Sequence, residues 1–540
     1  MESQLSTTGD RDTPRHQTEQ LVDTHENHAE SRTVVEVDAA SEPPSGVWAQ
    51  SDAAQGPSSQ VEQPYSIYIT WEKWFIVSAA AFASVFSPLV GTIYFPAIPV
   101  LASAFNKSVE LINLTVTVYM VLQGISPMFW GTLADRWGRR PMFLACTLVL
   151  ALSCVGLALV PTNMYWLLML LRCIQAAGSA STIALGAGVI GDIAAQYERG
   201  KFFGVWNIGP MAGPCIGPVL GGLLAQGLGW RSIFWFICIA SALCFAFLLA
   251  FLPETLRAIV GDGSIPPPPL YKPLIPVIGR NRPNSVLVVK VPRKKFQNPL
   301  RLFLYPDVAL LLLYNAILYS VFYAVTASIS TLFQSVYPWL SEIETGLCFL
   351  SIGGGMLIGG VITGRLLDWD YRRIKEKLMR SAVAEDSGEK MRPEDVTREE
   401  HFPIERARLR MMPIYFTISL VSCIGYGWCL DQKVSIAGPL VLLFIYGWAC
   451  VAIMNIVSTT LVDLAPEMSS SITACNNLCR CSFGAVCVSV IDLILNAIGA
   501  GWTYVLLAGP CVLVFPTIFV VMLKGPKWRE SRRARRQPSP

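Results

Sequence analysis

A run of about twenty apolar residues recurs twelve times in this 540-residue chain, and it constrains the fold more than any other feature. A helix of that length crosses the ~30 Å hydrocarbon core of a bilayer. The runs lie near 74–97, 112–133, 142–160, 165–190, 202–225, 231–252, 304–334, 345–367, 411–430, 437–461, 472–497 and 502–523. Helices satisfy their own backbone hydrogen bonds in lipid. We therefore expect an all-α membrane protein with twelve transmembrane helices.

The composition agrees with a membrane location and excludes several classes of function. Charged residues make up 15% of the chain, against about 25% in soluble globular proteins. The net charge of +4 is too small to indicate a nucleic-acid-binding protein. The four histidines lie outside the apolar runs and the fifteen cysteines lie inside them, so we expect no metal site, no bound cofactor and no disulfide framework.

Two hydrophilic stretches interrupt the apolar runs. The first follows the sixth run and divides the runs into two groups of six. The first seventy or so residues are polar and cannot bury enough apolar surface to fold. The expected organisation is a disordered tail over 1–72, a six-helix bundle over 73–253, a loop over 254–303, a second six-helix bundle over 304–524 with a further loop over 368–410, and a basic tail over 525–540.

The distribution of lysine and arginine predicts the orientation in the membrane. If the N-terminus is cytosolic, the cytosolic segments hold 37 of the 42 basic residues and the outer loops hold three. Cytosolic loops carry an excess of Lys and Arg. We therefore expect both termini and both long loops in the cytosol, and a plasma membrane or, alternatively, a vacuolar or vesicular membrane.

A charged loop after the second run recurs after the eighth. The first copy reads Gly131-Thr-Leu-Ala-Asp135-Arg136-Trp-Gly138-Arg139-Arg140, and Gly364, Leu366, Asp368, Arg372 and Arg373 follow at the same offsets 233 residues later. Such a repeat indicates duplicated halves, a common plan of transporters. A charge pair of Asp135 at a helix junction would stabilise one conformation and release in another. The alternative is a basic membrane anchor with a turn.

Three further runs contain residues that are costly or unusual in lipid. Arg172 and Gln175 lie inside the fourth run, and a buried arginine must face a cavity or a partner unless it reaches the interface. Asp492 is the carboxylate deepest within a run and could load and release a proton. The fifth run carries a small-residue and proline series that permits close helix packing: Gly209, Gly213, Pro214, Gly217, Pro218, Gly221 and Gly222.

These motifs together resemble the major facilitator superfamily. The loop from Gly131 to Arg140 looks like the signature loop of that family, which implies a gating role for Gly131, Asp135, Arg136, Gly138, Arg139 and Arg140. The Arg172-x-x-Gln175 stretch resembles the proton-coupling stretch of proton-driven members. The fifth run resembles the glycine–proline stretch of antiporters. The resemblance covers about 74–523 and implies the twelve-span drug:proton antiporter branch. Smaller features resemble its fungal members, among them Leu252-Pro253-Glu254 and Asn476-Asn477-Leu-Cys-Arg480.

The substrate route is expected between the halves near the middle of the membrane. Aromatic and polar candidates for contact with substrate are Tyr94, Tyr119, Gln123, Asn207, Tyr319, Tyr323, Tyr446 and Asn455, each of which could instead be packing. No acid in the first six runs offers a counter-ion for a cationic drug, which leaves room for neutral or anionic substrates. Asn106 and Asn113 begin glycosylation sequons close to a run.

The leading hypothesis is a proton-coupled exporter of amphipathic organic molecules such as drugs, toxins or a secondary metabolite. It would draw on the proton gradient, bind small-molecule substrate and protons within the bilayer, and act as a monomer. The alternatives are export of an organic acid or a polyamine, or a non-transporting sensor. A membrane enzyme is not expected, because the sequence lacks a Gly-x-Ser-x-Gly elbow and a histidine-based metal site.

Overall fold

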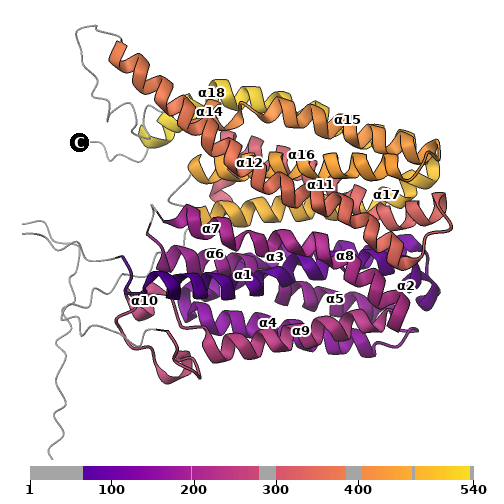
Figure 1. Ribbon diagram of the computed structural model, residues 1–540, viewed down its shortest axis with the longest axis horizontal. Coiled ribbons are helices and arrows are strands. Elements are labelled where there is room, and N and C mark those ends of the chain that lie inside the picture. Colours follow the sequence, from indigo (N-terminus) through magenta and orange to yellow (C-terminus); the bar gives the residue numbers. More distant parts are fainter. Residues whose placement is uncertain (1–64, 196–197, 279–298, 385–403, 465–468, 535–540) are drawn as a thin grey trace, which may run out of the picture. The chain divides into compact units, whose positions relative to one another are not determined.

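The computed structural model describes residues 65–195, 198–278, 299–384, 404–464 and 469–534. The predicted tail up to residue 64 and the middle of the two long loops lie outside the described residues. Within the described ranges every regular element is a helix. The fold is therefore all-α, as the apolar runs predicted, and its helices run side by side in two groups (Figure 1).

The first group, the N half, contains the first six spans. Its elements are α1 (Thr70–Thr92), η1 (Phe95–Ala97), α2 (Ile98–Phe105), α3 (Val109–Trp137), α4 (Arg139–Leu159), α5 (Tyr165–Ser179), α6 (Ser181–Ile193), α7 (Arg199–Trp206), α8 (Ile208–Leu228), α9 (Arg231–Phe251), α10 (Arg257–Val260) and η2 (Pro269–Tyr271). The fourth and fifth spans are each divided by a short break, between α5 and α6 and between α7 and α8.

The second group, the C half, contains the last six spans. Its elements are η3 (Pro299–Leu304), α11 (Pro306–Val336), α12 (Glu342–Ala384), α14 (Ile404–Leu409), α15 (Met412–Asp431), α16 (Ala437–Leu464), α17 (Ser469–Val514) and α18 (Pro516–Ala534). We call the end of the helices that carries Arg139, Arg408 and Arg532 the basic end. It lies to the left in Figure 1.

Eleven segments of the described chain are long and apolar enough to cross a membrane, and the last of them holds two spans. That segment, Ser471–Arg532, covers 62 residues. Its helix turns at Gly499, where φ is +74°, a value that favours glycine. The chain before Gly499 is the eleventh span, and the chain after it, continued by α18, is the twelfth.

The glycine series of α8 packs mainly within the N half. A Cβ atom at Gly213 would lie 2.7 Å from the backbone nitrogen of Leu89 in α1, and Gly209, Gly217 and Gly221 also face α1. Gly222, on another side of α8, approaches the backbone of Glu342 in α12. The series therefore packs α8 closely against α1, and Gly222 and Pro218 contact α12 of the C half.

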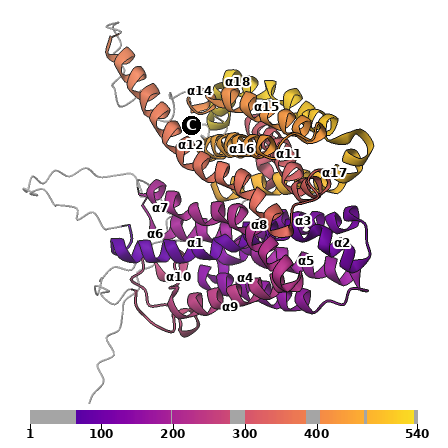
Figure 2. The ribbon, with the colours of Figure 1, turned by 45° about the vertical axis from the view of Figure 1, so that its right-hand side comes forward.

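The two halves meet along two pairs of helices, α3 with α17 and α8 with α12. Near the start of α12 the backbones almost touch, since a Cβ at Gly346 would lie 2.7 Å from the backbone oxygen of Pro218. Toward the basic end the contact passes to a side chain, where Met211 reaches Gly360. The separation of α8 and α12 therefore increases toward the basic end, and α12 projects beyond the other helices there (Figure 2).

Two predicted segment boundaries differ from the structure. The helix α12 continues to Ala384, so the first part of the expected loop 368–410 is helical. The helix α18 continues to Ala534, so most of the expected tail 525–540 is helical as well. Arg532 lies 2.9 Å and 2.5 Å from the two carboxylate oxygens of the fully buried Asp307. Arg532 therefore binds a buried carboxylate of the protein and does not lie in a free basic tail.

The Arg532–Asp307 pair generates a prediction about stability. Arg532→Gln leaves the Asp307 carboxylate buried without its partner, which costs about 3–5 kcal/mol. We expect the melting temperature in detergent to fall by several degrees, as followed by a thiol-reactive dye that reports exposure of buried cysteines. Lys527→Gln, on an exposed part of the same helix, should change little.

A double variant separates the charge effect from lost packing. Asp307→Asn combined with Arg532→Gln removes both charges, so it should melt above Arg532→Gln alone. If the double variant is no more stable than Arg532→Gln, the pair does not hold α18 through its charge.

Candidate functional site

The loop between α3 and α4 is held by ion pairs inside the N half. The Arg139 Nε lies 2.9 Å from Asp192 Oδ2 at the end of α6, and its Nη1 lies 2.8 Å from Asp135 Oδ1. The Asp135 side chain is 63% exposed and that of Asp192 is 14% exposed, so the Asp192 pair is the less screened of the two. The predicted charge pair of Asp135 is present, and Arg136 is exposed.

Glu254 closes this loop from the other side. Its buried carboxylate accepts hydrogen bonds from the backbone nitrogens of Arg139 and Arg140 (2.8 and 3.2 Å), at the start of α4. It also accepts from the backbone nitrogens of Thr255 and Leu256, both at 2.9 Å. Burial raises the pKa of Glu254, while these four donors lower it. Glu254 thus joins the N-terminus of α4 to the chain that follows α9.

The C half has an equivalent ion pair, at a place that the sequence repeat did not indicate. Arg408 Nε lies 2.9 Å from Asp463 Oδ2 at the end of α16, as Arg139 does from Asp192 at the end of α6. The repeat pointed instead to Asp368 and Arg372, whose side chains lie outside the described residues. Because α12 continues past the repeat, the arginine at the start of the ninth span, Arg408, lies 36 residues after Arg372.

Arg172 lies in the core of the N half and is 1% exposed. Its guanidinium carbon lies 4.2 Å from the centre of the Tyr94 ring and 4.4 Å from that of Tyr119, and its Nη1 donates to Gln175 Oε1 at 2.6 Å. Its Nε and Nη2 have no hydrogen-bond partner. Arg172 therefore faces a partner in the interior, and the alternative that it reaches outward to the interface is wrong.

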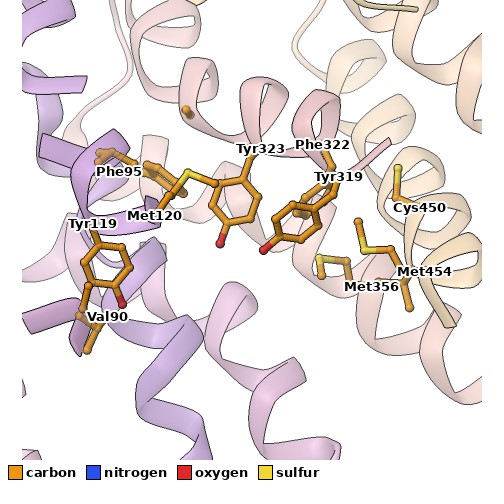
Figure 3. Packing of buried hydrophobic residues seen from close by; sticks show 14 of the residues in the cluster. Val90, Phe95, Tyr119, Met120, Tyr319, Phe322, Tyr323, Met356, Cys450 and Met454 are labelled. Atoms are coloured by element: carbon orange, nitrogen blue, oxygen red, sulfur yellow. The ribbon is translucent and has the colours of Figure 1, made fainter. Parts of the chain in front are cut away.

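Three tyrosines connect Arg172 to the other half. Tyr119 and Tyr323 meet at Gly91, where an added Cβ would lie 3.5 Å from the Tyr119 ring and 3.9 Å from the Tyr323 hydroxyl. Tyr323 packs on Tyr319 with ring centres 4.7 Å apart. We call Tyr119, Tyr323 and Tyr319 the tyrosine row. Figure 3 shows the row crossing from the N half to the C half beside Phe95 and Met120.

Arg480 lies at the far end of the tyrosine row. Its guanidinium carbon lies 4.4 Å from the centre of the Tyr319 ring, and its Nη2 donates to Asn477 Oδ1 at 3.2 Å. Asn477 in turn donates to the backbone oxygen of Gln123 in α3 at 2.8 Å. Each half thus places one arginine on the row, Arg172 at one end and Arg480 at the other.

Asp492 joins the halves near the end opposite to the basic end. Its carboxylate accepts a short hydrogen bond from the amide of Asn113 in α3. Close by, the Asn496 amide donates to Glu110 Oε1 at 3.4 Å, and the Gln226 side chain accepts from the backbone nitrogen of Ile343 at 3.0 Å. Asn113 is 1% exposed, so its amide has no room for a glycan and the prediction of glycosylation there is wrong. Asn106 is exposed, and its sequon stays a prediction.

The remaining candidates for substrate contact are dispersed. Tyr94 bonds Thr115 at 2.9 Å inside the N half, and Tyr446 packs beside Phe322 inside the C half. Gln123 is 8% exposed and faces α17. Asn207 is exposed at the break between α7 and α8, and Asn455 is partly buried in α16. The structure therefore brings Tyr119, Gln123, Tyr319 and Tyr323 together between the halves, and not the full set.

Two residues of the site, Glu254 and Arg480, were missed as functional candidates by the sequence reasoning. Both lay in motifs already noted as smaller features, Leu252-Pro253-Glu254 and Asn476-Asn477-Leu-Cys-Arg480. Arg480 gave a usable signal, since an arginine inside an apolar run is as unusual as Arg172. Glu254 gave a weaker one, because its role depends on contact with a loop more than 110 residues earlier.

Comparison with known proteins places the sequence in one family. The pattern of the Major Facilitator Superfamily matches residues 80–384. The chain is 36% identical to the MFS-type transporter phiD of a fungal species over 87% of this chain and 71% of the relative. It is 36% identical to citrate exporter 1 of Aspergillus niger, over 88% and 90%. It is 33% identical to the MFS antiporter QDR2 of Candida albicans, over 86% and 91%.

The geometry of the α3–α4 loop generates a matched pair of glycine variants. Gly138 has φ of +109°, and a Cβ there would overlap the Glu254 carboxylate, with the Glu254 carboxyl carbon at 3.0 Å. Gly138→Ala should therefore lower the melting temperature by several degrees and impair transport. Gly131→Ala adds a Cβ that meets nothing within 4 Å, so its melting temperature should match that of the wild type or exceed it slightly. Equal melting temperatures for the two variants would contradict this account of the loop.

Proposed function

The chain belongs to the Major Facilitator Superfamily, and on that premise we propose that it is a proton-coupled exporter of small organic molecules. The proposed mechanism is alternating access, in which the two halves rock about a central site. The charge distribution of the sequence supports a cytosolic location of the basic end, and the plasma membrane is the proposed membrane. We expect the protein to act as a monomer, with the proton gradient as its energy source, and to catalyse no chemical reaction.

The observation that carries this proposal is the uneven contact between the halves. Five hydrogen bonds between described residues join the N half to the C half, and each lies between the middle of the helices and the end away from Arg139. At the basic end the ion pairs of Arg139 and Arg408 each stay within one half. Such an arrangement supports a state that is closed on the outer side, with halves that can separate toward the cytosol.

Ion pairs confined to one half support rocking as rigid bodies. Arg139 holds α4 to α6, and Arg408 holds the start of the ninth span to α16. Both pairs are partly shielded from water, so breaking either costs more than breaking a fully exposed pair, and each half resists internal rearrangement. The movement between the two halves is then concentrated at their interface. The gating role proposed for the α3–α4 loop would be to control this movement.

Asp492 supports the proton-coupled part of the proposal. It is a carboxylate of the C half whose partner, Asn113, belongs to the N half. Opening of the outer side must separate the two residues and expose the carboxylate to water. A proton can then bind or leave in one conformation and be carried to the other. Arg172, which donates to Gln175, lies deeper in the N half and would support this step by its positive charge.

The alternatives differ in how well the interface would suit them. A polyamine would need carboxylates near the centre. The tyrosine row instead lies beside the positively charged guanidinium of Arg480. An organic acid would be attracted there, and one relative bears the name citrate exporter. A drug or secondary metabolite would be suited by the aromatic faces of the row. A non-transporting sensor would need no cross-half carboxylate such as Asp492.

The test is retention of a panel of neutral toxins, amphipathic cations and organic acids in yeast that lack their own pumps. We expect wild type to lower retention of at least one compound, and a protonophore to abolish that effect. Asp492→Asn cannot exchange a proton, so export should fall about tenfold or more. Asp431→Asn removes an exposed carboxylate at the same end of the helices and should export as wild type does.

Three outcomes would count against the proposal. Export that survives the protonophore would overturn proton coupling. Normal export by an Asp492→Asn protein present at wild-type levels in the membrane would overturn the role of Asp492. No change in retention of any compound by correctly delivered wild type would overturn export of these classes.

A further inference from the structure

Arg480 differs from the arginines of the basic end because no described residue gives it an acidic partner. Arg139, Arg408, Arg529 and Arg532 each lie within 3.5 Å of a carboxylate oxygen. The contacts recorded for Arg480 are the Tyr319 ring and the Asn477 amide oxygen, and its buried Nε has no hydrogen-bond partner. A guanidinium within a membrane span is costly unless its charge is balanced. The negative charge that balances the Arg480 guanidinium must therefore come from a group other than the described side chains.

Arg172 also lacks an acidic partner, and its position explains why it is the poorer candidate for contact with a ligand. It is enclosed between Tyr94 and Tyr119 inside the N half and is 1% exposed. Arg480 is partly exposed and lies where α17 meets α3 of the other half. A molecule between the halves could therefore reach Arg480 without entering the core of either half.

Asp492 cannot balance the charge of Arg480. The two residues lie on the same helix, twelve positions apart. At 1.5 Å per residue the separation along the helix is about 18 Å. Asp492 is moreover bonded to Asn113. The missing negative charge must therefore come from another source.

The groups around Arg480 suit an acid with an apolar body. The backbone oxygen of Gln123 accepts from Asn477, the residue that Arg480 also contacts. Gln123 is 8% exposed, and among the described residues its buried side-chain Oε1 has no hydrogen-bond partner. Tyr319 and Tyr323, whose rings pack at a tilt with centres 4.7 Å apart, present adjoining aromatic surface next to the guanidinium. A guanidinium donates two parallel hydrogen bonds to a carboxylate, a geometry that a lysine cannot reproduce. The amide of Gln123 would orient polar groups of a ligand, and the rings would cover its apolar part.

We propose that Arg480 binds the acid group of the transported molecule, so the substrate is an organic anion whose apolar body packs on Tyr319 and Tyr323. This inference rests on the proposed export function and specifies its substrate class. The anion supplies the charge that Arg480 lacks, and Arg480 repels cationic compounds. Binding of the transported molecule at Arg480 therefore favours acids over amides or amines of the same shape.

The experiment compares acids with their neutral amides on the purified full-length protein. The probes are benzoate, 2-naphthoate, decanoate and citrate, each with its amide, and the readout is the dissociation constant from ligand-dependent shifts of the melting temperature. We expect at least one acid to bind wild type about tenfold or more tightly than its amide, as the loss of a charge-assisted hydrogen bond implies. Arg480→Gln should remove that preference, and Arg480→Lys should restore part of it.

Arg231→Gln is the matched control. The Arg231 guanidinium lies 4.4 Å from the Trp230 ring, the same distance as Arg480 from Tyr319, and it donates to the backbone oxygen of Val160 inside the N half. This variant should keep the acid preference of wild type. If Arg480→Gln fails to fold, the wild-type comparison of acid and amide remains decisive by itself. Wild type that binds no acid more tightly than its amide overturns the proposal, and so does an unchanged preference in folded Arg480→Gln.

The binding experiment and the export experiment can fail independently, so their outcomes separate the two proposals. An Arg480-dependent preference for acids in the purified protein, with no export in yeast, would support the anion site and contradict the exporter function. Protonophore-sensitive export of a neutral or cationic compound that Arg480→Gln leaves unchanged would support the exporter function and overturn the anion site.

Discussion

Charge in a medium that cannot solvate it is the constraint on which this structure depends. At the basic end, Arg139, Arg408 and Arg532 are each matched to a carboxylate of the same half. Because these pairs do not cross between the halves, they stiffen each half and leave the interface free of strong ionic links at those positions. In the middle the rule changes, and Arg172 and Arg480 face aromatic rings instead of acids. The placement of paired and unpaired arginines thus separates the rigid bodies from the region between them.

Close backbone packing is the second contribution to this division. The glycine series of α8 brings that helix onto α1, so the first and fifth spans pack as one layer of the N half. On the other side of α8, Gly222 and Gly346 allow α8 and α12 to touch at the end away from Arg139. Contact of this kind depends on missing side chains and carries no polar cost when it separates. It therefore suits a surface that must close and open repeatedly.

Much of the fold was predictable from the sequence, because membrane spans are specified by length and hydropathy. The twelve runs, the division into two halves and the charge pair of Asp135 needed no knowledge of distant contacts. The role of Glu254, the pairing of Arg408 with Asp463 and the bond of Asn113 to Asp492 each join residues far apart in the sequence. The sequence repeat pointed to Arg372, whose side chain lies outside the described residues, and it did not indicate Arg408, because α12 continues past the repeat. The site was therefore predictable in its residue types and not in its partners.

The helix α17 carries both Asp492 and Arg480, with regular helix between them. A stiff rod with a carboxylate near one end and a guanidinium near its middle behaves as a lever. A tilt that withdraws Asp492 from Asn113 also shifts Arg480 relative to Gln123 and the tyrosine row. Proton state and cargo occupancy would then be linked by the rigidity of a single element, with no relay of intermediate side chains. A kink introduced between the two positions would uncouple them while leaving each one intact.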